Sequence, residues 1–250
     1  MRNEAPPILE LDVQHRAQSL SLDIAFHLST PWTVIFGPSG SGKTTVLRAI
    51  AGFIKPRSGF IRLGATVLFD SASRTCLRPH DRPVRSGAQL AHLFPNLSVR
   101  QNVEFGIPAS PGRVADQAVA AALIEEFGLD ALSERRPCDL SGGEKQRVSL
   151  ARTLVSVASA QRVLRRTPLL LLDEPFSGLD LRSRDNVMDA VLSFVRTRDI
   201  PVLSVTHDVG EAFRLGCEVL RVEAGRLADQ GPVATVLSRE RDLILKELAG

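Results

Sequence analysis

One short run of the sequence has the residue types and the spacing of a phosphate-binding loop. It spans Gly37–Thr44 and matches the pattern G-x-x-x-x-G-K-T. Glycines at these positions let backbone N–H groups converge on phosphate oxygens at a helix N-terminus, where the helix dipole favours anions. Lys43 would reach the β- and γ-phosphates, and the Thr44 hydroxyl would ligate Mg²⁺. The predicted nucleotide-binding residues are Gly37, Pro38, Ser39, Gly40, Ser41, Gly42, Lys43, Thr44 and Thr45.

Two adjacent carboxylates follow a short apolar segment much later in the chain. Asp173 and Glu174 come directly after Leu169–Leu172, which has the composition of a buried parallel strand. Neighbouring carboxylates at such a strand end can divide the work, one holding Mg²⁺ and the other polarising an attacking water. The alternative is a strand that ends in two exposed acids, which the phosphate-binding loop upstream disfavours. We therefore assign Asp173 to the metal and Glu174 to catalysis.

The elements around the loop are those that a phosphate site requires. Trp32–Phe36 is a compact apolar strand that leads directly into the glycines. From Thr44 to Ala51 the apolar residues recur at helical spacing, and the pattern stops at Gly52. The local context is therefore strand, loop and helix.

The rest of the chain alternates strands and helices. Strands are predicted at 8–13, 20–26, 169–172 and 202–205, with hairpins at 59–70 and 217–231. Helices are predicted between 98 and 166, mainly at 115–127 and 143–156, and again at 181–197. This alternation favours a mainly parallel sheet covered on both faces.

Composition excludes several classes of protein. The chain has 250 residues, 44% of them hydrophobic and 24% charged, and its net charge of +3 is too small to argue for nucleic acid. No apolar run approaches the roughly 18–20 residues of a membrane span, and the N-terminus lacks the apolar core of a signal peptide. The three cysteines have no metal-type spacing. The default expectation is a cytosolic protein.

A further segment lies between the loop and the acidic pair. Leu140-Ser141-Gly142-Gly143-Glu144 combines a serine hydroxyl, flexible glycines and a predicted helix start, and these could form a second anion site or simply cap a helix. The segment resembles the signature motif of ATP-binding-cassette (ABC) transporter ATPases. The resemblance implies that Ser141 and Gly143 contact the γ-phosphate of an ATP molecule held by the other subunit, and Gly142 is assigned to the same nucleotide site.

Three more positions resemble family motifs, two of them after the signature segment and one between Lys43 and Ser141. Ser177–Asp180 stands where the family keeps its D-loop, so Asp180 is assigned to the nucleotide site. His207 stands at the place of the switch histidine, whose imidazole hydrogen-bonds the γ-phosphate. Gln89 is the candidate for the Q-loop glutamine, which touches both the Mg²⁺ environment and the membrane subunit. We assign His207 and Gln89, with Glu174, to catalysis, and Gln89, with Thr44 and Asp173, to the metal.

The resemblance also implies a fold, cofactors and partners. The expected fold is an α/β P-loop NTPase (RecA-like) with a mainly parallel sheet core, an N-terminal antiparallel β subdomain and an inserted α-helical subdomain at about 90–165, all within one domain over 1–250. ATP and Mg²⁺ are the implied cofactors. The implied partners are a second copy in a head-to-tail homodimer, transmembrane permease subunits and a separate solute-binding protein, with no nucleic acid. The implied location is the cytoplasmic face of the plasma (inner) membrane, as a peripheral protein.

Three features depart from the family pattern. Val84–Ala88, just before Gln89, reads as a poor strand because it contains glycine and two other small residues. Val155–Thr167 is longer than the usual link and could be an extra helical turn or a surface loop. The chain contains no tyrosine, so His15 is the candidate to stack on adenine, against the alternative of an ordinary strand-end histidine.

Within the family the chain is most similar to molybdate-type importer ATPases. Thr30-Pro31-Trp32 and Leu93-Phe94-Pro95 contribute to this resemblance. The sequence given ends at Gly250 without the C-terminal oxyanion-binding domain that such subunits usually carry. We expect solute import, of molybdate or a related oxyanion. The alternatives are sulfate, iron or another solute, a soluble ABC ATPase acting on DNA or ribosomes, and a degenerate cassette that binds ATP without hydrolysing it.

Overall fold

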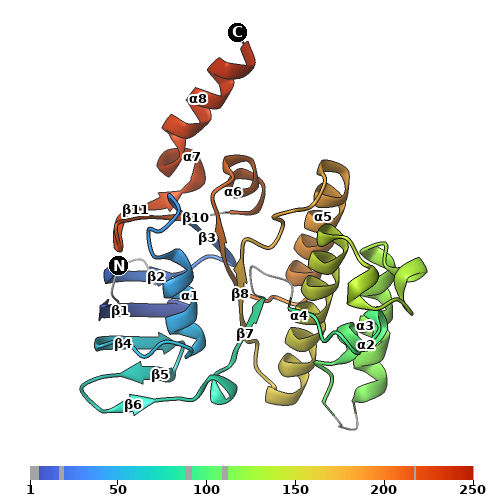
Figure 1. The fold of residues 1–250 in the computed structure, drawn as a ribbon. Helices are drawn as coiled ribbons and strands as arrows, with labels where there is room; N and C mark the ends of the chain where they lie inside the picture. The colour runs from blue at the N-terminus through green and yellow to red at the C-terminus, as the bar shows by residue number, and fades with distance from the viewer. Residues whose placement is uncertain (1–5, 17–19, 88–91, 109–111, 217, 250) are drawn as a thin grey trace. The chain divides into compact units, whose positions relative to one another are not determined.

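The structure is a computed structural model that describes residues 6–16, 20–87, 92–108, 112–216 and 218–249. Figure 1 draws its helices and strands. The contacts among the described residues divide the chain into two compact units. Unit 1 comprises Met1–Val84 with Pro201–Gly250, and unit 2 comprises Arg85–Ile200. The single domain expected over 1–250 stays a prediction, and each unit is described by itself.

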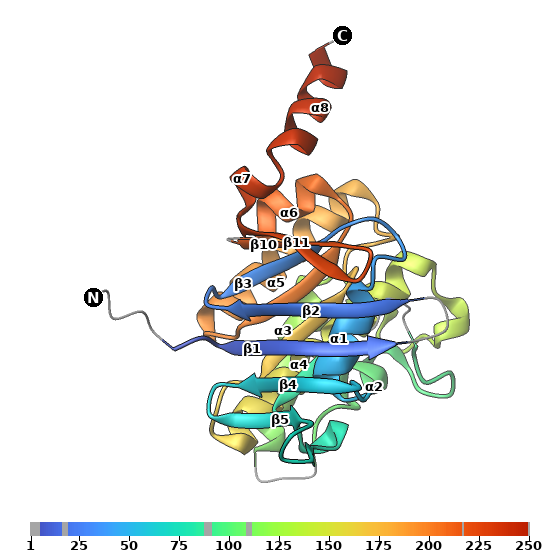
Figure 2. The same cartoon turned by 90° about the vertical axis from the view of Figure 1, so that its left-hand side faces the viewer.

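An antiparallel sheet forms the first part of unit 1. It contains β1 (Leu9–Arg16), β2 (Ser21–Leu28), β4 (Ser58–Leu63), β5 (Thr66–Asp70) and β6 (Thr75–Cys76), in the order β2-β1-β4-β5-β6. Figure 2 shows β1, β2, β4 and β5 lying side by side. Along β2, buried and exposed side chains alternate at every position, because successive side chains point to opposite faces of a sheet. The expected N-terminal β subdomain is confirmed.

A second sheet in unit 1 carries the strand that leads into the phosphate-binding loop. β3 (Trp32–Phe36) lies between β9 (Val202–Thr206) and β10 (Glu218–Glu223), parallel to both, and β11 (Arg226–Pro232) pairs antiparallel with β10. Every residue of β9 is buried, as expected for a parallel strand covered on both faces. The helical elements of unit 1 are α1 (Lys43–Ala51), the 3₁₀ helix Pro79–Asp81, α6 (Val209–Leu215), α7 (Val233–Val236) and α8 (Ser238–Ala249).

Unit 2 is mainly helical. Its α-helices are α2 (Val99–Glu104), α3 (Arg113–Glu126), α4 (Gly142–Leu164) and α5 (Leu181–Thr197), with 3₁₀ helices at Asp130–Leu132 and Pro137–Asp139. Two neighbouring strands, β7 (Val84–Gly87) and β8 (Leu169–Asp173), accompany them. Helices α2 and α3 both pack on α4. In the part of the chain that the structure describes, no helix is long and apolar enough to cross a membrane.

The segment predicted to be a poor strand does form one. β7 covers Val84–Gly87, so a short strand forms despite the unfavourable composition, while Ala88 lies outside the described residues. A Cβ atom at Gly87 would lie 3.2 Å from the Leu172 side chain and 3.3 Å from the Thr153 hydroxyl. A residue without a side chain therefore suits the close packing at this point, which outweighs the low strand propensity of glycine.

The long link at 155–167 is helical rather than a surface loop. Helix α4 continues to Leu164 and ends at Arg165, whose φ of 52° is left-handed. Arg162, on the added turns, forms an ion pair with Asp116 of α3. Gln161 donates to the Arg198 carbonyl over 2.8 Å. The extension therefore joins α4 to the start of α3 and to the residue that follows α5.

Candidate nucleotide-binding site

The phosphate-binding loop connects β3 to α1 in unit 1, as predicted. A Cβ atom at Gly37 would lie 2.1 Å from the Val222 carbonyl oxygen of β10, so only glycine fits against this strand. Gly42, directly before α1, has a φ of 106°, a conformation that favours glycine. The two glycines thus allow the loop to turn tightly at the edge of the sheet.

Lys43 folds back over its own loop. Its side chain is buried, and Nζ donates to the carbonyl oxygens of Gly37 and Pro38, each over 2.8 Å. These bonds hold a positive charge above the loop, while Pro38, Ser39 and Gly40 are exposed beside it. This arrangement puts a cation next to an accessible stretch of backbone, as phosphate recognition requires.

The start of α1 fits a phosphate group. Gly42 gives the helix no side-chain cap, and the first turn contains no acidic residue, so the dipole there favours an anion. Ser41 is only 3% exposed, and its hydroxyl oxygen has no hydrogen-bond partner among the described residues. A buried hydroxyl without a partner is rare in folded proteins and calls for an explanation. A phosphate oxygen bound by the loop would supply one.

His15 lies at the end of the antiparallel sheet that borders the loop. In the strand register it faces Leu22, whose side chain would be 3.3 Å from a Cβ atom at Gly42. The backbone of Gly225 joins the same region, because its N–H bonds to Ser41 and its carbonyl accepts from Asp23. The half-buried His15 is therefore near the loop, and its stacking on adenine stays a prediction.

His207 follows the strand next to the loop. In the parallel pair, Thr206 of β9 is opposite Phe36 of β3, so His207 and Gly37 leave the same edge of the sheet. His207 is exposed, while the strand that leads to it is buried. Ligands in sheets of this kind bind outside the carboxyl ends of the strands. Unit 1 thus brings the phosphate-binding loop and His207 to one edge.

The acidic pair ends β8 in unit 2. Asp173 is buried, and Glu174 adopts a left-handed φ of 46°, which is unusual for a residue with a side chain. Ser177 supports this conformation by donating to the Glu174 carbonyl from its hydroxyl over 2.9 Å and from its N–H over 3.2 Å. Backbone strain of this kind clusters at functional sites, so the geometry is consistent with a catalytic Glu174.

The signature segment, Leu140–Glu144, begins α4 with a capping box. The Ser141 hydroxyl accepts from the Glu144 N–H over 3.3 Å, and the Glu144 carboxylate accepts from the Ser141 N–H over 2.6 Å. The backbone hydrogen bond from Ser141 is the main reason that the pKa of Glu144 is lowered. The segment therefore caps its own helix and leaves Ser141 and Gly142 exposed, and its contact with a nucleotide stays a prediction.

The D-loop segment, Ser177–Asp180, lies against the start of α4 within unit 2. A Cβ atom at Gly143 would be 3.2 Å from the Gly178 carbonyl oxygen. Asp180 caps α5 by accepting from the Ser183 N–H over 3.0 Å, and its hydrogen bonds with Ser183 lower the pKa of this carboxylate. The signature segment and the D-loop segment therefore form one surface.

Sequence analysis missed Gln146 as a supporting residue. This buried glutamine of α4 donates from Nε2 to the Pro175 carbonyl over 3.0 Å, which ties the signature helix to the residue after Glu174. The only sequence signal was its position, four residues after Gly142 on a helix. The partner lies 29 residues further along the chain, so its identity could not be read from the local pattern.

The predicted site residues are divided between the two units. The phosphate-binding loop and His207 lie in unit 1, whereas Asp173, Glu174, the signature segment and the D-loop segment lie in unit 2. Gln89 lies outside the described residues. Their assembly into one site therefore stays a prediction.

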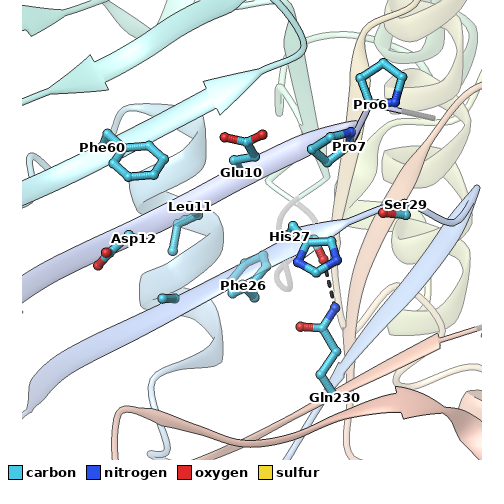
Figure 3. A pocket seen from close by; sticks show the side chains of 11 residues that line it. Pro6, Pro7, Glu10, Leu11, Asp12, Phe26, His27, Ser29, Phe60 and Gln230 are labelled. Carbon is cyan, nitrogen blue, oxygen red and sulfur yellow. Dashed lines mark hydrogen bonds between the residues drawn. The ribbon is translucent and has the colours of Figure 1, made fainter. Parts of the chain in front are cut away.

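Two of the hollows that the described residues form are lined by other residues than these. A large open one of about 1050 Å³ covers the outer face of the antiparallel sheet in unit 1, where Gln230 Nε2 donates to the His27 carbonyl over 2.8 Å (Figure 3). The other, of about 310 Å³, lies in unit 2. Its lining includes Arg85, Ser86, His92, Phe94, Phe105 and Arg152.

The chain is similar to curated molybdenum import ATP-binding proteins. It is 38% identical to ModC of Rhodospirillum rubrum over 93% of this chain and 60% of that protein. It is 39% identical to ModC of Pseudomonas syringae pv. tomato over 94% of this chain and 62% of that protein. The chain therefore spans about 60% of the length of these relatives.

Solved structures of ABC ATPase subunits support the fold expected from the sequence. The chain resembles cbiO1 from Clostridium perfringens, described as part of the ABC transporter complex cbiONQ, with a TM-score of 0.76 and 24% identity over 97% of this chain and 94% of that one. The ABC transporter family model matches residues 22–177, more than half of the sequence. The match includes the phosphate-binding loop, the signature segment and the acidic pair, and the chain belongs to the ABC transporter family.

Proposed function

We propose that this chain binds and hydrolyses ATP and thereby drives an importer for molybdate or a related oxyanion. The observation that carries the nucleotide assignment is the start of α1, where an uncapped helix, the buried Ser41 hydroxyl and the folded-back Lys43 surround one loop. Membership of the ABC transporter family supports ATP as the nucleotide. The named function of the ModC relatives supports molybdate as the solute.

Each site residue has a role in this proposal. The loop N–H groups, Ser41 and Lys43 bind and orient the phosphates. Thr44, Asp173 and Gln89 would hold Mg²⁺, which when bound neutralises charge on the phosphate oxygens. Glu174 accepts a proton from the attacking water, and His207 contacts the γ-phosphate.

A second copy of the chain would complete each site. In the proposed head-to-tail homodimer, each ATP lies between the phosphate-binding loop of one copy and the signature segment of the other. The exposure of Ser141 and Gly142 supports this arrangement, because a partner can reach them. Adenine would stack on His15.

The smaller hollow is the proposed contact for a transmembrane permease subunit. The rings of Phe94 and Phe105 lie 3.9 Å apart there, and both are substantially exposed. Burial lowers the pKa values of Arg85 and Arg152, which line the same hollow, so these cations gain from an acidic or carbonyl-bearing partner.

A separate solute-binding protein and a peripheral position on the cytoplasmic face of the inner membrane complete the proposal.

ATP hydrolysis by the purified chain tests the catalytic part. We expect Glu174→Gln to retain ATP binding, to lose turnover by roughly 10²–10⁴-fold, and to trap a dimer in the presence of ATP. Glu125→Gln, which neutralises an exposed carboxylate of α3, is the matched control and should behave like the unmodified protein. Near-normal turnover of Glu174→Gln would overturn the role assigned to this residue.

Uptake measurements test the solute. In the cell that encodes this chain, Glu174→Gln should abolish uptake of labelled molybdate while leaving uptake of sulfate and iron unchanged. Loss of sulfate or iron uptake instead would replace molybdate with that solute. Unchanged uptake of all three, with ATP turnover lost, would point to an ABC ATPase that does not serve these importers.

A further inference from the structure

A closed set of hydrogen bonds surrounds the backbone of His207. The Thr206 hydroxyl accepts from the Asp208 N–H over 3.1 Å and bonds to the Glu211 carboxylate over 2.6 Å. The Asp208 side chain in turn accepts from the Glu211 N–H over 2.9 Å. We call Thr206, Asp208 and Glu211 the histidine clamp, because the exposed His207 lies within the loop that they close.

The direction of each hydrogen bond in the clamp follows from the other bonds. A hydroxyl has a single proton, and the Thr206 oxygen already accepts from the Asp208 N–H. Its own proton is therefore directed to the Glu211 carboxylate, which accepts it. The carboxylate thus sets the orientation of the hydroxyl, and the hydroxyl sets the position of the backbone on both sides of His207.

Burying the polar side chains of the clamp costs free energy of folding, so the arrangement calls for an explanation. Thr206 is 3% exposed and Glu211 5% exposed, and a carboxylate is seldom so buried without specific partners. Capping α6 does not by itself require it, since the Asp208 side chain already caps this helix. What the Glu211 side chain adds is a link from the helix to the last residue of β9, which lies opposite Phe36 beside the phosphate-binding loop.

We propose that Glu211 is a positioning residue that acts through Thr206 to hold His207 in place for its contact with the γ-phosphate. The inference rests on the role of His207 given under the proposed function and extends it to two buried residues. A rigid link matters because a misplacement of about 1 Å can cost up to roughly 100-fold in rate. Positioning by buried neighbours is also the general way in which exposed site residues are kept in a productive geometry.

Hydrolysis kinetics of paired variants test the clamp. Thr206→Val removes the hydroxyl with little change in shape, and we expect kcat to fall about tenfold with KM for ATP within about twofold. Thr206→Ser keeps the hydroxyl and should restore kcat. Glu211→Ala should match Thr206→Val, whereas Glu211→Gln retains an oxygen acceptor and should lose less.

Thr33→Val is the matched control. Thr33 is fully buried on the neighbouring strand and hydrogen-bonds to the Glu218 carboxylate over 3.4 Å, but it lies opposite Leu203, away from His207. We expect it to leave kcat unchanged. An equal loss of kcat in Thr33→Val would mean that any buried threonine of the sheet has this effect, which would overturn the proposal.

A His207→Ala background separates the clamp from the role of His207. If the clamp acts through the histidine, Thr206→Val should cause no further loss of kcat in this background. The same tenfold loss there would overturn the positioning role. A large loss in His207→Ala together with normal kcat in Thr206→Val would overturn the clamp alone. Normal turnover in His207→Ala would overturn both the clamp and the proposed role of His207.

Hydrogen exchange tests the clamp without reference to catalysis. Thr206→Val should speed exchange of the Asp208 amide, whose bond to the hydroxyl is lost, and Thr33→Val should not. Unchanged exchange at Asp208 would show that the hydroxyl does not hold this turn and would overturn the proposal whatever His207 does.

Discussion

The phosphate-binding loop and the signature segment are both helix starts, but they are completed in opposite ways. Helix α1 follows a left-handed glycine, without a side-chain cap in the described structure and without an acid in its first turn. Helix α4 follows Ser141, which forms a reciprocal capping box with Glu144. The first start is open to an anion, whereas the second satisfies the N–H groups of Ser141 and Glu144 from within and carries a negative charge.

From this difference we expect the two segments to meet phosphate at different stages. The α1 start needs no rearrangement, so we expect it to bind the nucleotide in the single chain. At α4 a phosphate would compete with the Glu144 carboxylate for the N–H groups and would be repelled by its charge. We therefore expect the signature segment to contribute only when a second copy supplies an already bound nucleotide.

The largest expected effect is at the open helix start. Lys43→Ala removes the cation above the phosphate-binding loop and should weaken ATP binding by the single chain by roughly 10- to 100-fold, because charge-assisted hydrogen bonds are lost. Titration with a fluorescent ATP analogue measures this. Lys55→Ala, at an exposed position after α1, is the control. Equal affinities of the two variants would contradict the phosphate-loop assignment.

Ser141→Ala should separate dimer formation from nucleotide binding. Loss of the cap should cost about 1 kcal/mol of stability, and ATP-dependent dimerisation should weaken while ATP binding by the single chain is kept. Ser98→Ala removes the same kind of capping box from α2 and should cost similar stability without affecting the dimer. Light scattering with ATP measures dimer formation. If both variants dimerise equally well, the signature segment does not contribute to the ATP-bound dimer.

The ion pair between Arg162 and Asp116 tests what holds the C-terminal turns of α4 against α3. Burial would raise the pKa of Asp116, but the hydrogen bonds and positive charge of Arg162, together with Ser159, outweigh it and lower the pKa. Because the folded pKa is below the unfolded one, this stabilisation is present above about pH 4 and is lost as the pH falls through the folded value. Asp116→Asn should cost about 1–2 kcal/mol at neutral pH, since Arg162 is partly exposed and can be solvated.

Thermal unfolding as a function of pH checks this prediction. The difference in Tm between the unmodified protein and Asp116→Asn should narrow below about pH 4. A difference that does not depend on pH would show that packing, rather than the ion pair, holds the extension of α4 to α3.

The smallest expected effect concerns the charge at the capped start. Glu144→Gln keeps an oxygen for the Ser141 N–H but removes the negative charge from the first turn of α4. We expect ATP-dependent dimerisation to strengthen by roughly twofold, with stability lowered by only a few tenths of a kcal/mol. Titration of dimer formation against ATP at low salt measures the change. Weaker dimerisation would mean that the carboxylate assists the partner's nucleotide instead of opposing it.

Most elements of the fold could be predicted from the sequence, since their signals are local. Strand β3 and helix α5 have the predicted bounds, and the predicted α1 begins one residue later than the observed helix. The extension of α4 to Leu164 and the strand at β7 could not be predicted in the same way. Both depend on neighbours distant in sequence, Asp116 for the extension and Leu172 with Thr153 for Gly87.

The sequence by itself determined which chemical groups are present and how they are ordered along the chain. A glycine-rich loop between a strand and a helix acts through its own backbone, and a serine three residues before a glutamate caps a helix locally, so both could be predicted from contiguous residues. The left-handed Glu174 and the Gln146 contact to Pro175 were decided by tertiary structure, whereas the histidine clamp joins residues within five positions of one another. The Gln146 contact depends on how α4 packs beside the D-loop segment. Periodic patterns in sequence record which face of an element is buried but not which partner it meets.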